Sequence, residues 1–194
     1  MRESVLVVDR GKLFSQKNFQ GFLQAGEHDF FQNIAENFRF ERRNEVENNP
    51  AIKQIIPYNI LTNGSKVFLY WRKAKQTDER AKEKYSVGMG GHINDTDKSK
   101  DFEQTIENGR RRELKEEVDL HDGEVELAGF INDESNSLNS VHFGIVYLVT
   151  AGENIKIKEE DIMEGQFVDK KDLKKYFDKM ERWSQLVCEN LLGR

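Results

Sequence analysis

Short apolar runs bounded by turn residues alternate along the chain with stretches in which apolar residues recur at helical spacing. The runs predict six strands, at Val5–Val8, Lys53–Leu61, Lys66–Arg72, Glu124–Phe130, Ser140–Val149 and Glu164–Asp169. Asn63-Gly64 predicts a hairpin turn between two of them. Helical spacing predicts helices at Asp29–Phe38, Gly109–Leu120 and Lys170–Leu192. A helix enclosed by strands and followed by a C-terminal helix predicts an α/β/α sandwich with a mixed β-sheet.

The first fifty residues are predicted to form an N-terminal extension that packs on the main domain. Residues Arg39–Asn49 (RFERRNEVENN) are highly charged and end at Pro50, which is typical of a linker. We therefore place the extension at residues 1–50 and the main domain at residues 51–194.

The helix predicted at Gly109–Leu120 concentrates its acidic residues on one side. Glu113, Glu116 and Glu117 fall within about 100° of arc, because each residue of an α-helix turns the chain by roughly 100°. Like charges at this spacing repel, and a hard divalent cation offsets such repulsion because it prefers carboxylate oxygens. Arg112 is placed to orient a neighbouring carboxylate. The alternative is an acidic helix face that is merely solvated.

A glycine pair, Gly90-Gly91, follows a strand-like run upstream of this helix, and glycines there let backbone groups approach a ligand closely. With the segment Arg112–Val118 (RELKEEV), the pair resembles the Nudix box, G-x5-E-x7-R-E-U-x-E-E-x-G-U, in which U is aliphatic. The stretch ERAKEKYSVGMGGHIN is also similar to a little-described, MutT-like branch of Nudix proteins regarded as phosphoesterases.

The chain departs from the box at three points. Twenty residues, 92–111, separate Gly91 from Arg112 where the box has thirteen, so Asn94–Lys100 is interpreted as a polar insertion that shapes the mouth of a cleft. Gln104 occupies the position of the first glutamate of the box, and Asp119 that of the closing glycine. Gly109 lies within the arc of glutamates, either because a neighbouring group approaches closely or through tolerated drift.

The resemblance implies a Nudix fold and the hydrolysis of a phosphoanhydride bond in a nucleoside diphosphate linked to another moiety. It implies Mg²⁺, or Mn²⁺ as an alternative, held by Glu113, Glu116 and Glu117, with Gly90 and Gly91 binding through backbone groups. Glu113 and Arg112 are the implied catalytic residues of the box. The general base varies in this superfamily, and Glu164 is the candidate outside the box, with Glu159 and Glu160 as rivals. A Nudix-like module that binds a nucleotide without cleaving it is the alternative function.

Composition narrows the classes of partner. A net charge of −5 argues against general binding to nucleic acid or to an anionic membrane, because both need a cationic surface. The single cysteine, Cys188, excludes an intrachain disulfide, and we find no apolar run typical of a signal peptide or a membrane span. We therefore expect a cytoplasmic protein with a small nucleotide as its ligand. A homodimer is compatible with this composition.

Overall fold

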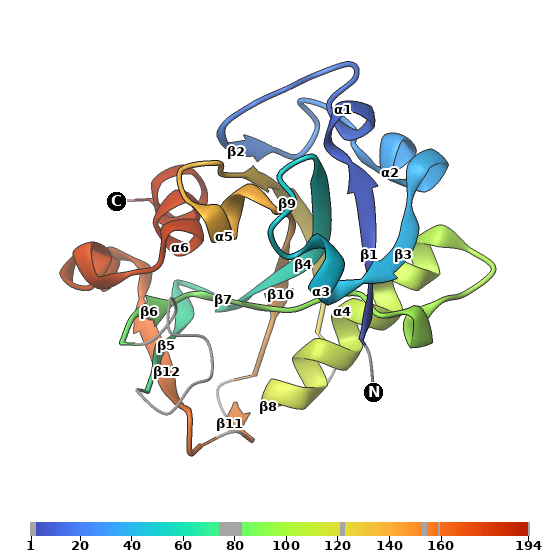
Figure 1. Ribbon diagram of the computed structural model, residues 1–194. Helices are drawn as coiled ribbons and strands as arrows, with labels where there is room; N and C mark the ends of the chain where they lie inside the picture. Colours follow the sequence, from blue (N-terminus) through green and yellow to red (C-terminus); the bar gives the residue numbers. More distant parts are fainter. Residues whose placement is uncertain (1–2, 74–82, 121–122, 153–154, 159, 194) are drawn as a thin grey trace. The chain divides into compact units, whose positions relative to one another are not determined.

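A computed structural model describes residues 3–73, 83–120, 123–152, 155–158 and 160–193 of the chain (Figure 1). The fold divides into two compact units, the first made of Met1–Tyr58, Gly90–Arg112 and Gly129–Val146, and the second of Asn59–Met89, Glu113–Ala128 and Tyr147–Arg194. Five elements contribute residues to both units: β4 (Ile52–Asn63), β7 (Gly88–Gly90), α4 (Phe102–Glu117), β9 (Val125–Asn132) and β10 (His142–Thr150).

The remaining elements belong to one unit each. Those of the first unit are β1 (Ser4–Asp9), α1 (Arg10–Leu13), β2 (Gly21–Gln24), α2 (Phe31–Asn37), β3 (Arg39–Arg42), α3 (Arg43–Val46), the 3₁₀ turn η1 (Asp95–Asp97) and α5 (Ser137–Ser140). Those of the second are β5 (Lys66–Arg72), β6 (Tyr85–Ser86), β8 (Val118–Asp119), β11 (Lys156–Ile157), β12 (Met163–Asp169), the 3₁₀ turns η2 (Lys170–Lys175) and η3 (Phe177–Lys179), α6 (Arg182–Val187) and the π turn η4 (Cys188–Leu192).

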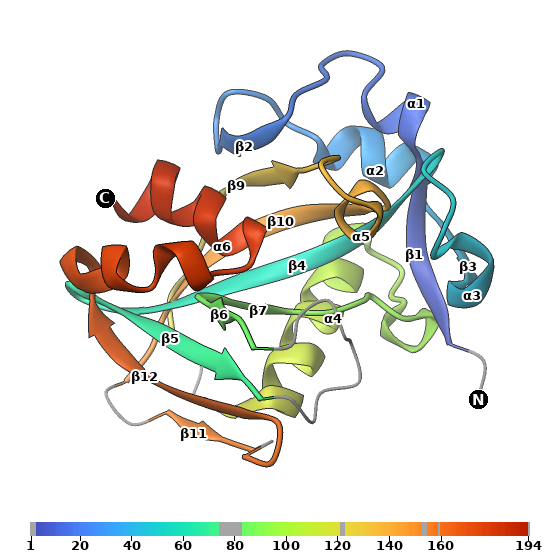
Figure 2. The ribbon, with the colours of Figure 1, turned by 60° about the vertical axis from the view of Figure 1, so that its left-hand side comes forward.

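In the first unit, the N-terminal strand β1 pairs with two partners. It is antiparallel to β3, with Leu6 opposite Phe40, and antiparallel to the start of β4, with Val7 opposite Gln54 (Figure 2). The strand predicted at Val5–Val8 is therefore confirmed, and the helix predicted at Asp29–Phe38 is confirmed as α2. The expectation of a linker at Arg39–Asn49 is wrong, because this range forms β3 and α3. The domain boundary after residue 50 stays a prediction.

Aromatic rings form much of the core of the first unit. Phe30 is fully buried, and its ring centroid lies 5.2 Å from those of both Phe130 and Phe143. Phe14 and Phe19 complete the group, with centroid distances of 5.5–6.2 Å to Phe30 or Phe143. Edge-to-face contacts of this kind add about 0.5–1.5 kcal/mol each beyond the apolar area that they bury.

A buried lysine ties three segments of the first unit together. Lys53 on β4 is inaccessible to solvent, and its Nζ lies 3.0 Å from the Glu134 carboxylate and donates to the carbonyl of Ser140 at 2.6 Å. Arg10 donates to both oxygens of the same carboxylate, at 2.7 and 3.0 Å. The Arg10 hydrogen bonds, and after them Lys53, lower the pKa of Glu134 to about 2 although partial burial acts in the opposite direction.

This lowered pKa predicts a pH dependence of stability. A carboxylate whose pKa is lower in the folded chain stabilises the fold above its ordinary value of 4.5, and the contribution is lost as the pH falls towards 2. After allowance for solvent screening it amounts to about 1 kcal/mol, or a few degrees in melting temperature. We expect Glu134→Gln to melt lower than the wild type at pH 6, with the difference narrowing below pH 4.5 and closing as the pH approaches 2. A constant difference between the two proteins would contradict this assignment.

In the second unit, β5 pairs with β12 along its whole length, from Arg72 opposite Met163 to Lys66 opposite Asp169 (Figure 2). The predicted hairpin is confirmed, because Thr62 pairs with Val67 and Gly64 adopts a φ of +56° in the turn. The strand predicted at Glu164–Asp169 is confirmed as β12.

The single long helix predicted at Lys170–Leu192 is wrong, because this segment forms two 3₁₀ turns and then α6 with a terminal π turn. The break falls at Met180–Glu181. The backbone N–H of Glu181 donates to the carbonyl of Tyr85 at 3.0 Å. Its carboxylate accepts from the backbone N–H groups of Trp183 and Ser184, both at 2.8 Å, and so caps the start of α6. These contacts stop the helical pattern that the apolar spacing indicates.

Candidate functional site

The acidic helix predicted at Gly109–Leu120 is confirmed as α4, which begins seven residues earlier, at Phe102, and ends at Glu117, so that all three glutamates lie in its last two turns. Glu116 is exposed, and Glu113 and Glu117 are half-buried. Leu114 and Val118 alternate with them and are buried in the core of the second unit. This apolar flank holds the end of the helix in place, while Glu116 keeps access to solvent and Oε2 of Glu117 is buried.

The end of α4 explains why no glycine is needed at Asp119. The chain passes directly from the helix into β8, where Asp119 pairs with Lys156. Lys158 covers the last turn, since its backbone N–H donates to the carbonyl of Glu117 at 2.9 Å and its Nζ to that of Lys115 at 2.6 Å. A cation at a helix C-terminus also interacts favourably with the helix dipole. Among the described non-glycine residues only Glu83 has a positive φ, so Asp119 does not adopt the left-handed conformation expected of the box glycine.

A buried tyrosine lies within the electrostatic reach of Glu117. The Tyr70 hydroxyl donates to the carbonyl of Gly88 at 2.7 Å and accepts from Arg72 at 2.6 Å. Burial raises the pKa of Tyr70 well above its ordinary value; the Arg72 charge opposes this change, and the negative charge of Glu117 adds to it. Tyr70 therefore stays protonated and serves as a neutral neighbour of this glutamate.

The glycine pair lies at the end of β7: Gly90 is the last residue of the strand, Gly91 comes directly after it, and both belong to the first unit. A Cβ on Gly90 would overlap the carbonyl oxygen of Pro57 and lie 3.1 Å from its carbonyl carbon. Gly90 is therefore required by the close approach of the β4 backbone, which gives it a structural reason beside its expected role in binding. Gly91 is partly exposed. The binding role of both glycines stays a prediction.

Arg112, the box arginine, binds an aspartate of the insertion. Its Nε and Nη2 donate to the two carboxylate oxygens of Asp97, at 2.9 and 2.8 Å, and Nη2 also donates to the carbonyl of His92 at 2.8 Å. Asp97 is only 6% exposed, so this acid of the insertion is turned inward and does not line the mouth of a cleft. Neither Asp97 nor its pairing with Arg112 could be predicted from spacing, because fifteen positions separate them.

The same contacts account for Gly109 on α4. A Cβ at this position would lie 2.9 Å from Cγ1 of Ile93 and 3.2 Å from Oδ2 of Asp97. The glycine therefore allows the insertion to approach the helix closely. Of the two explanations of Gly109, close approach is therefore favoured over tolerated drift. The approaching groups are side chains of the protein itself.

A histidine pair lies next to the glycine pair in the first unit. His92 Nε2 and His142 Nε2 are 3.4 Å apart, and Nδ1 of His142 lies 2.7 Å from the carbonyl of Leu138, to which it donates in the tautomer protonated there. Burial lowers the pKa of His92 well below 6.5, and the positive charges of Arg43 and then of His142 and Arg112 lower it further. His92 is therefore neutral near pH 7.

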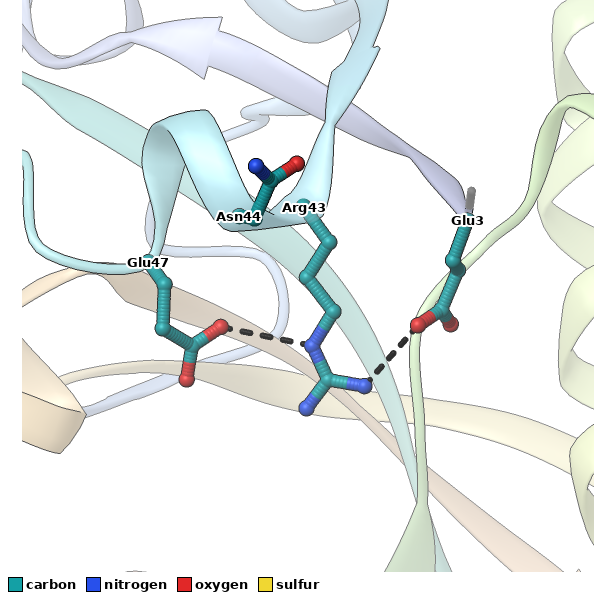
Figure 3. A pocket seen from close by; sticks show the side chains of 4 residues that line it. All are labelled: Glu3, Arg43, Asn44 and Glu47. Carbon is teal, nitrogen blue, oxygen red and sulfur yellow. Dashed lines mark hydrogen bonds and ion pairs between the residues drawn. The ribbon is translucent and has the colours of Figure 1, made fainter. Parts of the chain in front are cut away.

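The Arg43 side chain comes from α3, within the range that the sequence indicated as a linker. It lines a pocket of about 390 Å³ together with Glu3, Asn44 and Glu47. Figure 3 shows the guanidinium between two carboxylates, with Glu3 Oε2 at 3.0 Å and Glu47 Oε2 at 3.3 Å.

The candidate base outside the box, Glu164, lies on β12 opposite Trp71. Its side chain is 69% exposed and lies 3.6 Å from Nζ of Lys73, so it is an accessible carboxylate with a weak ion pair. Glu160 is exposed and its carbonyl accepts from Lys73 at 2.9 Å, whereas Glu159 lies outside the described residues.

Within the described ranges, no three side chains of His, Cys, Asp or Glu converge closely enough to form a ready-made metal site. The three α4 glutamates share one arc of a helix and supply oxygen donors, the type that a hard divalent cation prefers. Their role as metal ligands stays a prediction. None of the described helices is long and apolar enough to cross a membrane.

Solved structures place the fold in a known class. No family model matches the chain. The crystal structure of Tm1382, which is assigned to the Nudix hydrolases, superposes with a TM-score of 0.86 and 29% identity and covers 98% of both chains. A MutT Nudix hydrolase from Burkholderia pseudomallei superposes over 72% of this chain and 98% of its own, with a TM-score of 0.52 and 14% identity. The predicted mixed α/β Nudix fold with a mixed β-sheet is thus confirmed.

A sequence relative then narrows the class. Protein YmaB of Bacillus subtilis (strain 168) is 31% identical over 202 residues, and the alignment covers 98% of each chain. The chain therefore belongs to the Nudix hydrolase superfamily and, within it, to the family of YmaB.

Proposed function

We propose that this protein is a divalent-metal-dependent hydrolase that cleaves a phosphoanhydride bond in a nucleoside diphosphate linked to another moiety. The observation that carries the proposal is the set of three glutamates in the last two turns of α4, the first of which directly follows Arg112. Binding a nucleotide does not by itself require three clustered carboxylates. The Nudix domain of Shewanella oneidensis NrtR, which has the same fold with a TM-score of 0.54 and 15% identity, has been solved with ADP ribose, a molecule of the proposed class.

Glu113, Glu116 and Glu117 would hold Mg²⁺ or Mn²⁺. A bound divalent cation neutralises phosphate charge and lowers the pKa of an attacking water. The apolar flank of α4 and the contacts of Lys158 hold the glutamate-bearing turn in place. The glutamates would therefore lose little conformational entropy when they bind a cation. Gly90 and Gly91 present backbone groups to the substrate, and Glu164 takes the proton of the attacking water as the general base.

The proposal is tested by the release of phosphate, or of a nucleoside monophosphate, from a panel of nucleotides. The panel contains nucleoside triphosphates, dinucleoside polyphosphates and nucleoside diphosphate sugars including ADP-ribose, each with Mg²⁺, with Mn²⁺ and with EDTA. We expect metal-dependent cleavage of at least one diphosphate-linked compound. Saturable binding of a nucleotide with no turnover under any condition would replace the proposal by the non-catalytic binding module.

Metal binding also predicts a change in stability. The three glutamates repel one another on one arc, so a cation that joins them raises the melting temperature by linkage, by about 2.7 kcal/mol at a hundredfold excess over its Kd. We expect a rise of several degrees in millimolar Mg²⁺, and its loss in the double variant Glu113→Gln/Glu116→Gln. The double variant Glu103→Gln/Glu126→Gln removes two exposed charges elsewhere and should keep the response. An identical wild-type melting curve with and without Mg²⁺ would favour a merely solvated helix.

A further inference from the structure

The chain lacks an acid at the first glutamate position of the box and has a buried acid nearby. Gln104 is exposed on α4, and its side chain donates to Asn108 at 2.9 Å. Asn108 in turn donates to the backbone carbonyl of Asp97 at 3.0 Å, which fastens the insertion to the helix. These hydrogen bonds therefore hold Asp97, an acidic residue that lies outside α4, close to Arg112 on the helix.

The carboxylate of Asp97 is shared between the helix and the loop that follows the glycine pair. Oδ2 accepts from the backbone N–H of Asn94 at 2.8 Å as well as from Arg112. Arg112 also donates to the carbonyl of His92, the residue after Gly91. These bonds connect three segments of the first unit: the glycine loop, the insertion and α4.

We propose that Asp97 is a positioning residue for the reaction, and that the insertion supplies the acid that the box lacks at position 104. Asp97 binds Arg112, and Arg112 binds the carbonyl of His92, so Asp97 helps to fix the loop after Gly91 against α4. Glu113 is the next residue of the same helix. The kinetic part of this inference rests on the proposed function, whereas the tethering of the loop does not.

The contact needs a charged, two-oxygen partner. A carboxylate matches the planar fork of the guanidinium with two parallel, charge-assisted bonds, which an amide cannot reproduce. Asp97→Asn keeps the size of the side chain, removes its charge and turns one acceptor into a donor. The Arg112 guanidinium, which is about a quarter exposed, then loses its pair of charge-assisted bonds to Asp97 and the orientation that these two bonds impose.

The experiment compares Asp97→Asn with two matched controls in the full chain. Asp95→Asn removes an exposed charge from the same 3₁₀ turn, and Glu134→Gln breaks a different ion pair of the first unit. We expect Asp97→Asn to lower kcat about 10- to 100-fold, at temperatures well below melting, with KM within about threefold of wild type. Asp95→Asn should keep the wild-type kcat, and Glu134→Gln should lose stability without losing kcat.

Two measurements keep the inference decidable. Asp97→Glu retains the charge but moves the carboxylate; it should lower kcat with little change in melting temperature, and it replaces Asp97→Asn if that variant does not fold.

Amide hydrogen exchange of residues 90–94 should rise about tenfold or more in whichever Asp97 variant folds, and not in Glu134→Gln. A kcat that follows stability alike in all variants, or unchanged exchange in the Asp97 variants, would overturn the inference. If the wild type cleaves nothing on the panel, the proposed function fails while the exchange measurement still decides whether Asp97 tethers the loop.

Discussion

Glu117→Gln is expected to lower kcat about 1,000-fold on a true substrate, which corresponds to about 4 kcal/mol of transition-state stabilisation. The substitution removes a charge and almost no volume. Glu117 is half-buried at the end of α4, and its charge acts on the buried hydroxyl of Tyr70. In the proposed function it would hold a divalent cation, which would supply positive charge to the reacting phosphates, and a neutral amide binds a hard dication much more weakly.

Glu103→Gln is the matched control, because it removes an exposed charge from the first turn of the same helix. Its kcat should stay within about twofold of wild type. Circular dichroism and melting temperature should show that both variants fold. If Glu117→Gln turns over at a near-normal rate, the assignment of this glutamate to the metal is wrong.

Gly90→Ala is expected to lower the free energy of unfolding by about 3 kcal/mol or more. The new Cβ would overlap the carbonyl oxygen of Pro57, so backbone has to move, and a strand in a packed core moves only at considerable cost. Urea denaturation monitored by tryptophan fluorescence would measure the loss as a lower midpoint.

Gly11→Ala provides the comparison for this change in the same unit. Nothing lies within 4 Å of a Cβ at Gly11, which belongs to the helical turn α1. Alanine there should leave stability unchanged or raise it by up to about 1 kcal/mol. Equal midpoints for the two alanine variants would show that the approach of β4 to Gly90 is looser than described.

Local patterns predicted those elements whose signals lie within a few residues of one another. The Asn63-Gly64 hairpin, the apolar flank Leu114 and Val118 of the acidic helix, and the aromatic face of α2 are of this kind. The linker expected at Arg39–Asn49 failed because β3 is defined by pairing with β1, more than thirty positions earlier. The C-terminal helix failed because the bond from Glu181 to Tyr85, a contact distant in sequence, overrides helical periodicity.

The same distinction separates the two halves of the candidate site. The glutamates of α4 were recognisable because helical geometry alone places them on one arc. Asp97, His92 and Arg43 were not, because each acquires its neighbours only when distant segments fold together. The seven additional residues showed where the chain departs from the box, but they did not show that the side chain of one of their acids is buried.

The binding of Arg112 by Asp97 has a consequence for how this loop can diverge among relatives. A box with fixed spacing depends on the number of residues between glycine and arginine, whereas here the loop is anchored at its midpoint by an ion pair. The segment between that anchor and the start of α4 is itself bonded to the helix, because the backbone N–H of Ser99 donates to the Thr105 hydroxyl at 2.9 Å and the Asp101 carboxylate accepts from the backbone N–H of Glu103 at 3.1 Å. The length of this loop and the presence of an acid at the position of Asp97 should therefore vary together among relatives. A relative that lacks the seven additional residues should also lack this acid.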